Sequence, residues 1–110
     1  MAFTRTLTRS ITAATTVRTG TSASGDVVIG LRITNTTAAA IKASAWILSG
    51  GQTYYLVGGA TNSTMGADIP VGGSLIVING DIDKVVMTTA DVIKVEASGA
   101  VDTICSALEN

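Results

Sequence analysis

Apolar and polar residues alternate with a period of two along most of the chain after residue 25. Between Asp26 and Thr34, every second side chain is apolar and shares one face of an extended segment, and residues 41–48 repeat this pattern. Helical periodicity is almost absent, and glycine-rich turns separate the runs. The pattern predicts seven or eight short strands, which is typical of an all-β, antiparallel β-sandwich of immunoglobulin-like or jelly-roll-like type. The expected strands cover 26–34, 41–48, 53–57, 74–78, 84–87, 92–97 and 101–108, with 69–73 as a short edge segment.

The positions near the strand centres predict the core of this domain, which we assign to residues 26–110. The side chains expected to be largely buried are Ile29, Leu31, Ile33, Trp46, Val77, Val95 and Ile104. The only cysteine, Cys105, lies in the last alternating run, where a small buried hydrophobic residue fits. A single cysteine cannot form a disulfide within the chain, and we expect a reduced thiol.

Residues 1–25 have a different composition. They are rich in threonine, which favours extended backbone, and contain few large apolar groups. We therefore expect an extended N-terminal arm that adds a strand to a neighbouring chain. Its predicted contacts are Phe3, Arg5, Leu7 and Arg9. The alternative is a disordered tail followed by a first core strand near residues 11–18.

Charge is divided unevenly between these two segments. Residues 1–25 contain three arginines and no acid, whereas residues 26–110 contain four basic and eight acidic residues. The arm could therefore dock on an acidic neighbour, including the domain of another copy. The formal net charge of −1 argues against nucleic acid as the main partner. The N-terminal residues do not match a signal peptide, and no apolar run reaches the length of a membrane helix, so no membrane partner is expected.

Residue types that commonly act in catalysis or bind metals are scarce. The chain has no histidine, so the commonest general base and metal ligand are missing, and no partner is available to activate Cys105 or a serine. Asp81 and Asp83 lie beside Gly80, but the segment lacks the length and terminal glutamate of an EF-hand loop, and a solvated turn explains them. We expect no catalytic, cofactor or metal site, and the protein is not expected to be an enzyme.

Three of the four aromatic residues lie near one predicted hairpin. Tyr54 and Tyr55 are adjacent, so they point to opposite faces and one must be exposed, while Trp46 is expected to fill the core. An exposed tyrosine could anchor a protein interface or stack on a sugar.

Several stretches of residues 26–109 resemble small virion structural proteins of tailed bacteriophages. They are 28–37 (VIGLRITNTT), 54–57 (YYLV), 69–75 (IPVGGSL), 91–95 (DVIKV) and 101–109 (VDTICSALE). The resemblance implies a β-sandwich present in many copies on a virion, made in the host cytoplasm, with no catalytic residues to carry over. Within this group we expect a capsid decoration (cement) protein that stabilises contacts between major capsid subunits. The expected partners are the major capsid protein or another virion protein, and copies of itself as a homo-oligomer, with a trimer as one candidate. The alternatives are a neck, tail or fibre component, or a carbohydrate-binding adhesion module on the virion.

Overall fold

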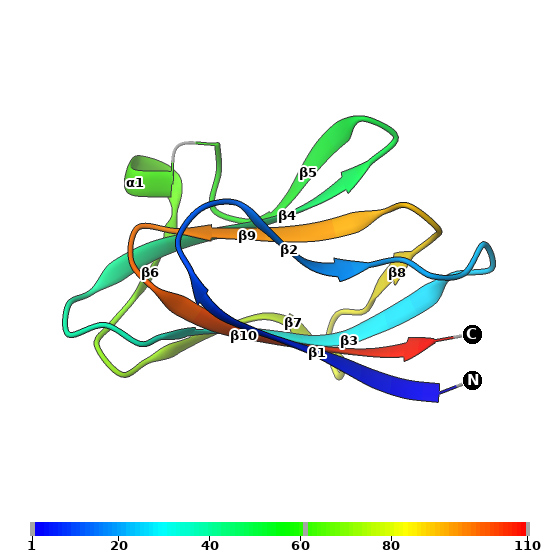
Figure 1. The fold of residues 1–110 in the computed structure, drawn as a ribbon, viewed down its shortest axis with the longest axis horizontal. Coiled ribbons are helices and arrows are strands. Elements are labelled where there is room, and N and C mark those ends of the chain that lie inside the picture. Colours follow the sequence, from blue (N-terminus) through cyan, green and yellow to red (C-terminus); the bar gives the residue numbers. More distant parts are fainter. Residues whose placement is uncertain (1, 61, 110) are drawn as a thin grey trace.

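The computed structural model describes residues 2–60 and 62–109, and it confirms an all-β fold with two antiparallel sheets packed face to face (Figure 1). Sheet A contains β1 (Ala2–Ile11), β10 (Val101–Glu109), β3 (Asp26–Asn35), β7 (Ser74–Asn79) and β8 (Val85–Met87). Sheet B contains β2 (Thr15–Thr19), β9 (Val92–Ala97), β4 (Ile41–Ser49), β5 (Gln52–Val57) and β6 (Ala67–Ile69). A single helical turn, α1 (Asn62–Met65), lies between β5 and β6.

The strand order follows one scheme in both sheets. Sheet A runs β1-β10-β3-β7, and sheet B runs β2-β9-β4-β5. β7 and β8 both pair with β3, so together they fill one edge position of sheet A. β5 and β6 both pair with β4 and together fill one edge position of sheet B. When the two strands that share an edge are counted as one position, the described strands fill eight positions, four in each sheet.

The structure does not show the separate N-terminal arm. β1 instead pairs with β10 from Ala2 opposite Glu109 to Thr8 opposite Thr103, and β2 pairs with β9 in the other sheet. The threonines of β1 point toward the sandwich interior, where half-buried β-branched side chains fit a strand, so few large apolar residues are needed. A bulge then reverses the alternation before Ile11, with Ser10 in the left-handed region at φ 56°.

Arg18 on β2 binds the N-terminal strands to the rest of the domain. Its guanidinium lies between the sheets and donates to Thr4 Oγ1 at 3.1 Å, to Asp26 Oδ2 at 3.3 Å and to Glu109 Oε2 at 2.6 Å. These acceptors belong to β1, β3 and β10, so one buried cation connects sheet B with three strands of sheet A. Residues 2–19 thus supply an edge strand to each sheet.

The core contains only some of the predicted side chains. Leu31, Ile33 and Val95 are fully buried, as expected, and Val77 packs against the core while only partly buried. The prediction for Ile29 is wrong because a bulge in β3 places Gly30 opposite Ser106 and Val28 opposite Ala107, which leaves Ile29 as the extra residue.

Trp46 and Ile104 also lie outside the core. On β10 the buried positions are Val101, Thr103, Cys105 and Ala107. Adjacent residues of a strand face opposite sides, so Ile104 faces outward and remains 45% exposed. Trp46 is half-buried on the outside of sheet B for the same reason, because Ala45 beside it occupies the core.

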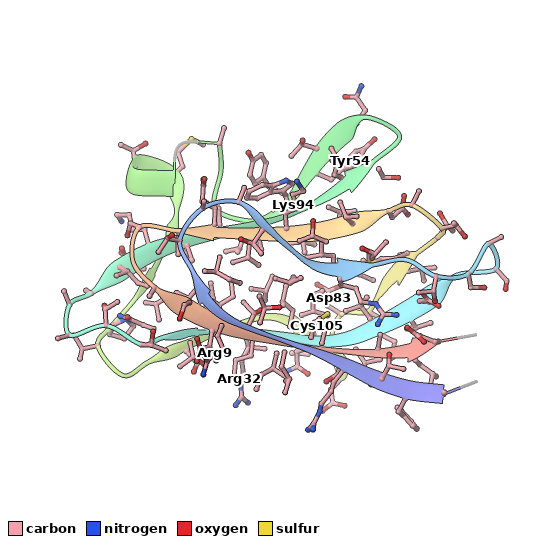
Figure 2. The ribbon with its side chains drawn as sticks, viewed as in Figure 1. Arg9, Arg32, Tyr54, Asp83, Lys94 and Cys105 are labelled. Carbon is pink, nitrogen blue, oxygen red and sulfur yellow. The ribbon has the colours of Figure 1, made fainter. Side chains whose placement is uncertain are left out.

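The expectation of a buried thiol at Cys105 is confirmed. The side chain lies between the sheets (Figure 2), and burial raises the pKa of the thiol to about 11 although the nearby positive charge of Arg18 opposes the shift. This cysteine therefore stays protonated at neutral pH and acts as a packing residue.

Candidate protein-binding face

The outer side of sheet A, which we call the sheet A face, carries all four side chains predicted as contacts of the arm. Phe3, Arg5, Leu7 and Arg9 alternate with threonines along β1, and all four are exposed, with 80% of Phe3 accessible. That these residues contact a neighbouring chain stays a prediction. They belong, however, to a strand within the domain's own sheet, whose neighbours on β10, β3 and β7 extend the same surface.

The strand register arranges the sheet A face into rows that cross all the strands. The Phe3 row contains Phe3, Leu108, Val27 and Val86, and the Leu7 row contains Leu7, Ile104, Arg32 and Ile76. Both rows are apolar except for Arg32. Cross-strand neighbours on one face lie about 5 Å apart, so each row forms a continuous ridge.

A third row, between these two, contains Arg5, Ser106, Gly30 and Asn79. Its central members are small, and a hollow of about 390 Å³ lies there, with Arg32, Ile76 and Ile104 on its wall. The sheet A face is therefore ridged, with a depression in the Arg5 row that a partner's side chains could enter.

In the part of the chain that the structure describes, no ion pair neutralises the arginines of this face. Among the described residues, the ion pairs involve Arg18 and Lys42 and none involves Arg5, Arg9 or Arg32. Arg9 and Arg32 point away from the sandwich (Figure 2). The one nearby acid, Asp102, accepts a hydrogen bond from the backbone N–H of Ser10 at 3.0 Å. Three free guanidinium groups beside two apolar ridges form a surface suited to an acidic and apolar partner.

The outer side of sheet B, which we call the sheet B face, has a different character. Trp46 and Tyr55 pack with their ring centres 5.7 Å apart, and the β4–β5 hairpin that carries Tyr55 projects beyond the sandwich (Figure 1). Tyr54 and Tyr55 are both exposed, because the projecting hairpin leaves each side of β5 open. The ring pair of Trp46 and Tyr55 is the feature that could receive a sugar.

Several other polar groups of sheet B are paired within the chain, although none of the ion pairs of the described residues involves Lys94 or Glu96 on the outer side of β9. Lys42 forms an ion pair with Asp68 at 2.6 Å, and the hydroxyl of buried Ser44 donates to the carbonyl of Gly59 at 3.1 Å. Hydrogen bonds from Ser49 and then from Thr88 lower the pKa of Asp91, which lies in the turn between β8 and β9.

The described part of the chain contains no group of three potential metal ligands. No helix within it is long and apolar enough to cross a membrane. Asp81 and Asp83 lie in the turn between β7 and β8, with exposed side chains.

Comparison with known proteins identifies no relative. A scan against models of protein families, a search of curated proteins and a search of solved structures each found no match to this chain.

Sequence reasoning found only the part of the sheet A face that lies on β1. Ile104 was assigned to the core, and Arg32, Ile76 and Val86 were given no role. The missing signal was available in the strict alternation of β10, since a buried Cys105 requires an exposed Ile104. Val86 and Ile76 could be placed only after the pairing of β3 with β7 and β8 was known.

Proposed function

We propose that this protein is a non-enzymatic structural component of a bacteriophage virion, and that it works by packing its sheet A face against another protein chain. The observation that carries the proposal is the coexistence, on one face, of two apolar ridges and three arginines that form no ion pair with any described residue. An exposed apolar surface of this kind marks an interaction site in soluble proteins. Within a virion we assign the protein to capsid decoration, as the resemblance of residues 26–109 to phage structural proteins suggests.

We further propose that the sandwich is a jelly roll. Numbered over its eight strand positions, sheet A has the order 1-8-3-6 and sheet B the order 2-7-4-5, so the first position pairs with the last and the second with the seventh. This nesting of distant strands supports a jelly roll over an immunoglobulin-like arrangement, in which consecutive hairpins dominate. Jelly rolls occur in viral capsid proteins and in lectins, so the analogy favours both candidate functions and decides between neither.

A pair of matched double variants tests the role of the sheet A face. Leu7, Ile76, Tyr54 and Val71 are all between 57% and 59% exposed, but only the first two lie on the sheet A face. We expect Leu7→Ser/Ile76→Ser to lose attachment to capsid particles that lack the protein, while Tyr54→Ser/Val71→Ser retains it. Both variants should unfold at nearly the wild-type temperature, because none of the four side chains is in the core.

The readout is occupancy on particles after removal of unbound protein, with isolated tails as a second substrate. Binding to tails alone would place the protein in the tail instead of the capsid. Equal occupancy of both variants would contradict the role of the sheet A face.

The second candidate, a carbohydrate-binding module, rests on the Trp46–Tyr55 pair of the sheet B face. Binding to a glycan array that Tyr55→Ala abolishes and Leu7→Ser leaves unchanged would favour this function.

A further inference from the structure

We propose that the partner on the sheet A face is a second copy of this chain, docked face to face about a two-fold axis parallel to the strands. The inference rests on the proposed function of this face as a protein-binding surface and names its occupant. It follows from the register of sheet A and from the position of two acidic residues at its edge.

The axis direction determines which strands meet. Sheet A has β1 at one edge and β7 with β8 at the other. A two-fold axis along the strands exchanges these edges and leaves the position along the strands unchanged. Each row therefore meets itself in reverse order, with Phe3 over the partner's Val86 and Leu7 over the partner's Ile76. The apolar side chains of the two ridges thus face those of the other copy, except that Arg32 lies over the partner's Ile104.

The twist of packed sheets shifts this match at the sheet edges and leaves it nearly unchanged at the central strands. Aligned sheets cross at about 30°, and the outer strands of a four-stranded sheet lie roughly 7 Å from the central axis. The rotation displaces an edge residue by about 4 Å, which is roughly the rise of one residue. This is a little over half of the spacing of roughly 6.6 Å between rows on one face, whereas the central strands β10 and β3 shift by only about 1 Å, so the ridges cross and stay in contact there.

The Arg5 row supplies the charge complementarity. Its opposite end is Asn79, where β7 ends and the turn containing Asp81, Asp83 and one base, Lys84, begins. The two-fold axis places Arg5 over this turn of the partner, and the same contact occurs a second time by symmetry. Among the described residues neither Asp81 nor Asp83 has an ion pair, so both carboxylates are available.

The turn holds these acids at the edge of the sheet. The carbonyl of Asn79 accepts hydrogen bonds from the backbone N–H groups of Ile82 at 3.0 Å and Asp83 at 2.7 Å. A Cβ atom at Gly80 would lie 2.7 Å from the carbonyl oxygen of Ile29, so glycine allows the turn to press against β3. Ile82, which is 85% exposed, adds an apolar contact at the same place.

The other face-to-face orientation is disfavoured by charge. A two-fold axis across the strands would stack β1 on the partner's β1 and bring Arg5 and Arg9 against the same two arginines. Like charges in an interface oppose association, whereas the axis along the strands pairs each Arg5 with carboxylates.

The size of the face is sufficient for a specific dimer of modest affinity. Four strands of about nine residues cover roughly 20 Å by 30 Å, or about 600 Å² per copy. Specific interfaces bury roughly 600–1,000 Å² per partner, so this dimer lies at the lower limit and should dissociate on dilution.

Reciprocal charge reversal tests the inference in solution, without any virion component. The variants are Arg5→Asp and the double variant Asp81→Arg/Asp83→Arg, studied by sedimentation equilibrium alone and as an equimolar mixture. In a homodimer of either variant, both symmetric contacts join like charges. In the mixed dimer, both contacts join opposite charges again.

We expect each variant alone to dimerise at least tenfold more weakly than wild type, and the mixture to recover to within about threefold. Arg9→Asp is the matched control, because Arg9 lies on the same exposed side of β1 in the direction away from the acidic turn. It should weaken the dimer less than threefold.

Monomeric wild-type protein at millimolar concentration, or variants whose association is unchanged, would overturn the inference. A mixture of the two variants that dimerises no more tightly than each variant alone would also overturn it. Failure of this inference is distinguishable from failure of the proposed function, because occupancy on particles is measured separately from dimerisation. Monomeric wild-type protein whose attachment to particles is lost in Leu7→Ser/Ile76→Ser would leave the sheet A face bound to a capsid chain instead of a second copy.

Discussion

Sheets A and B both turn one side to solvent, but they hold their outward polar groups differently. On sheet B, Lys42 is paired with Asp68, Asp91 accepts hydrogen bonds from its neighbours, and the loop after β5 covers Ser44. On sheet A, three arginines extend from the face without a carboxylate partner in the described residues.

The apolar side chains of the two faces differ in the same way. Trp46 on sheet B is half-buried against Tyr55, whereas Leu7, Ile76 and Ile104 on sheet A are all about half exposed or more. The sheet B face thus pairs more of its polar and aromatic groups within the chain, although Lys94 and Glu96 on β9 take part in none of the ion pairs of the described residues. The sheet A face leaves both its charges and its apolar area for another molecule, and this difference is why we assign protein binding to sheet A.

We expect the largest effect on stability from the arginines of the N-terminal strands. Arg18 points into the sandwich, whereas Arg9 points to solvent. Arg18→Met should destabilise the protein by about 3–5 kcal/mol, because it leaves the buried carboxylate of Asp26 without its cation. Arg9→Met should change the free energy of unfolding by less than about 0.5 kcal/mol, since Arg9 is exposed. Urea unfolding monitored through Trp46 fluorescence measures both. Equal midpoints for the two variants would show that the N-terminal strands are not bound to the domain as described.

These arginines show what sequence reasoning could and could not establish. The alternation of residues 26–108 was sufficient for the all-β sandwich and for most strand positions. The composition of residues 1–25 was misleading, because threonines at the inward positions of β1 can replace larger core residues at a sheet edge. No local pattern indicates that Arg18 faces inward while Arg5 and Arg9 face outward, because a bulge in β2 and long-range pairing set that direction.

The sheet A face, our candidate binding surface, was only partly predictable for a related reason. The period of two places Phe3, Arg5, Leu7 and Arg9 on one side of β1 without knowledge of the fold. The rows that extend this side across β10, β3 and β7 depend on register, and the bulge at Ile29 shifts that register by one residue. A face assembled from strands distant in sequence therefore needs the structure.

A smaller effect is expected from Cys105, the inward neighbour of Ile104 on β10. Its thiol pKa rises from 9.0 to about 11 on folding, so above pH 9 the unfolded chain loses a proton that the folded chain keeps. Stability is unaffected below pH 9 and falls as pH rises from 9 to 11, by on the order of 2 kcal/mol. Cys105→Ala removes this dependence, so the difference in unfolding free energy between the two proteins should change over that interval. A constant difference would indicate that the thiol is accessible to water.

The smallest effect compares one apolar residue from each outer face. Trp46→Ala should destabilise the monomer by roughly 0.5–1.5 kcal/mol from the lost ring pair alone, because Trp46 packs against Tyr55 within the chain. Ile104→Ala should cost the monomer less than about 0.5 kcal/mol, because Ile104 is 45% exposed and has no covering layer. Both values should be measured by thermal unfolding at micromolar concentration, where self-association is weak. At millimolar concentration Ile104→Ala should weaken the dimer more than Trp46→Ala does, because Ile104 belongs to the Leu7 row and Trp46 lies on the other sheet. If Ile104→Ala destabilised the dilute monomer as much as Trp46→Ala does, the sheet A face would be packed within the chain. The distinction between the two faces would then fail.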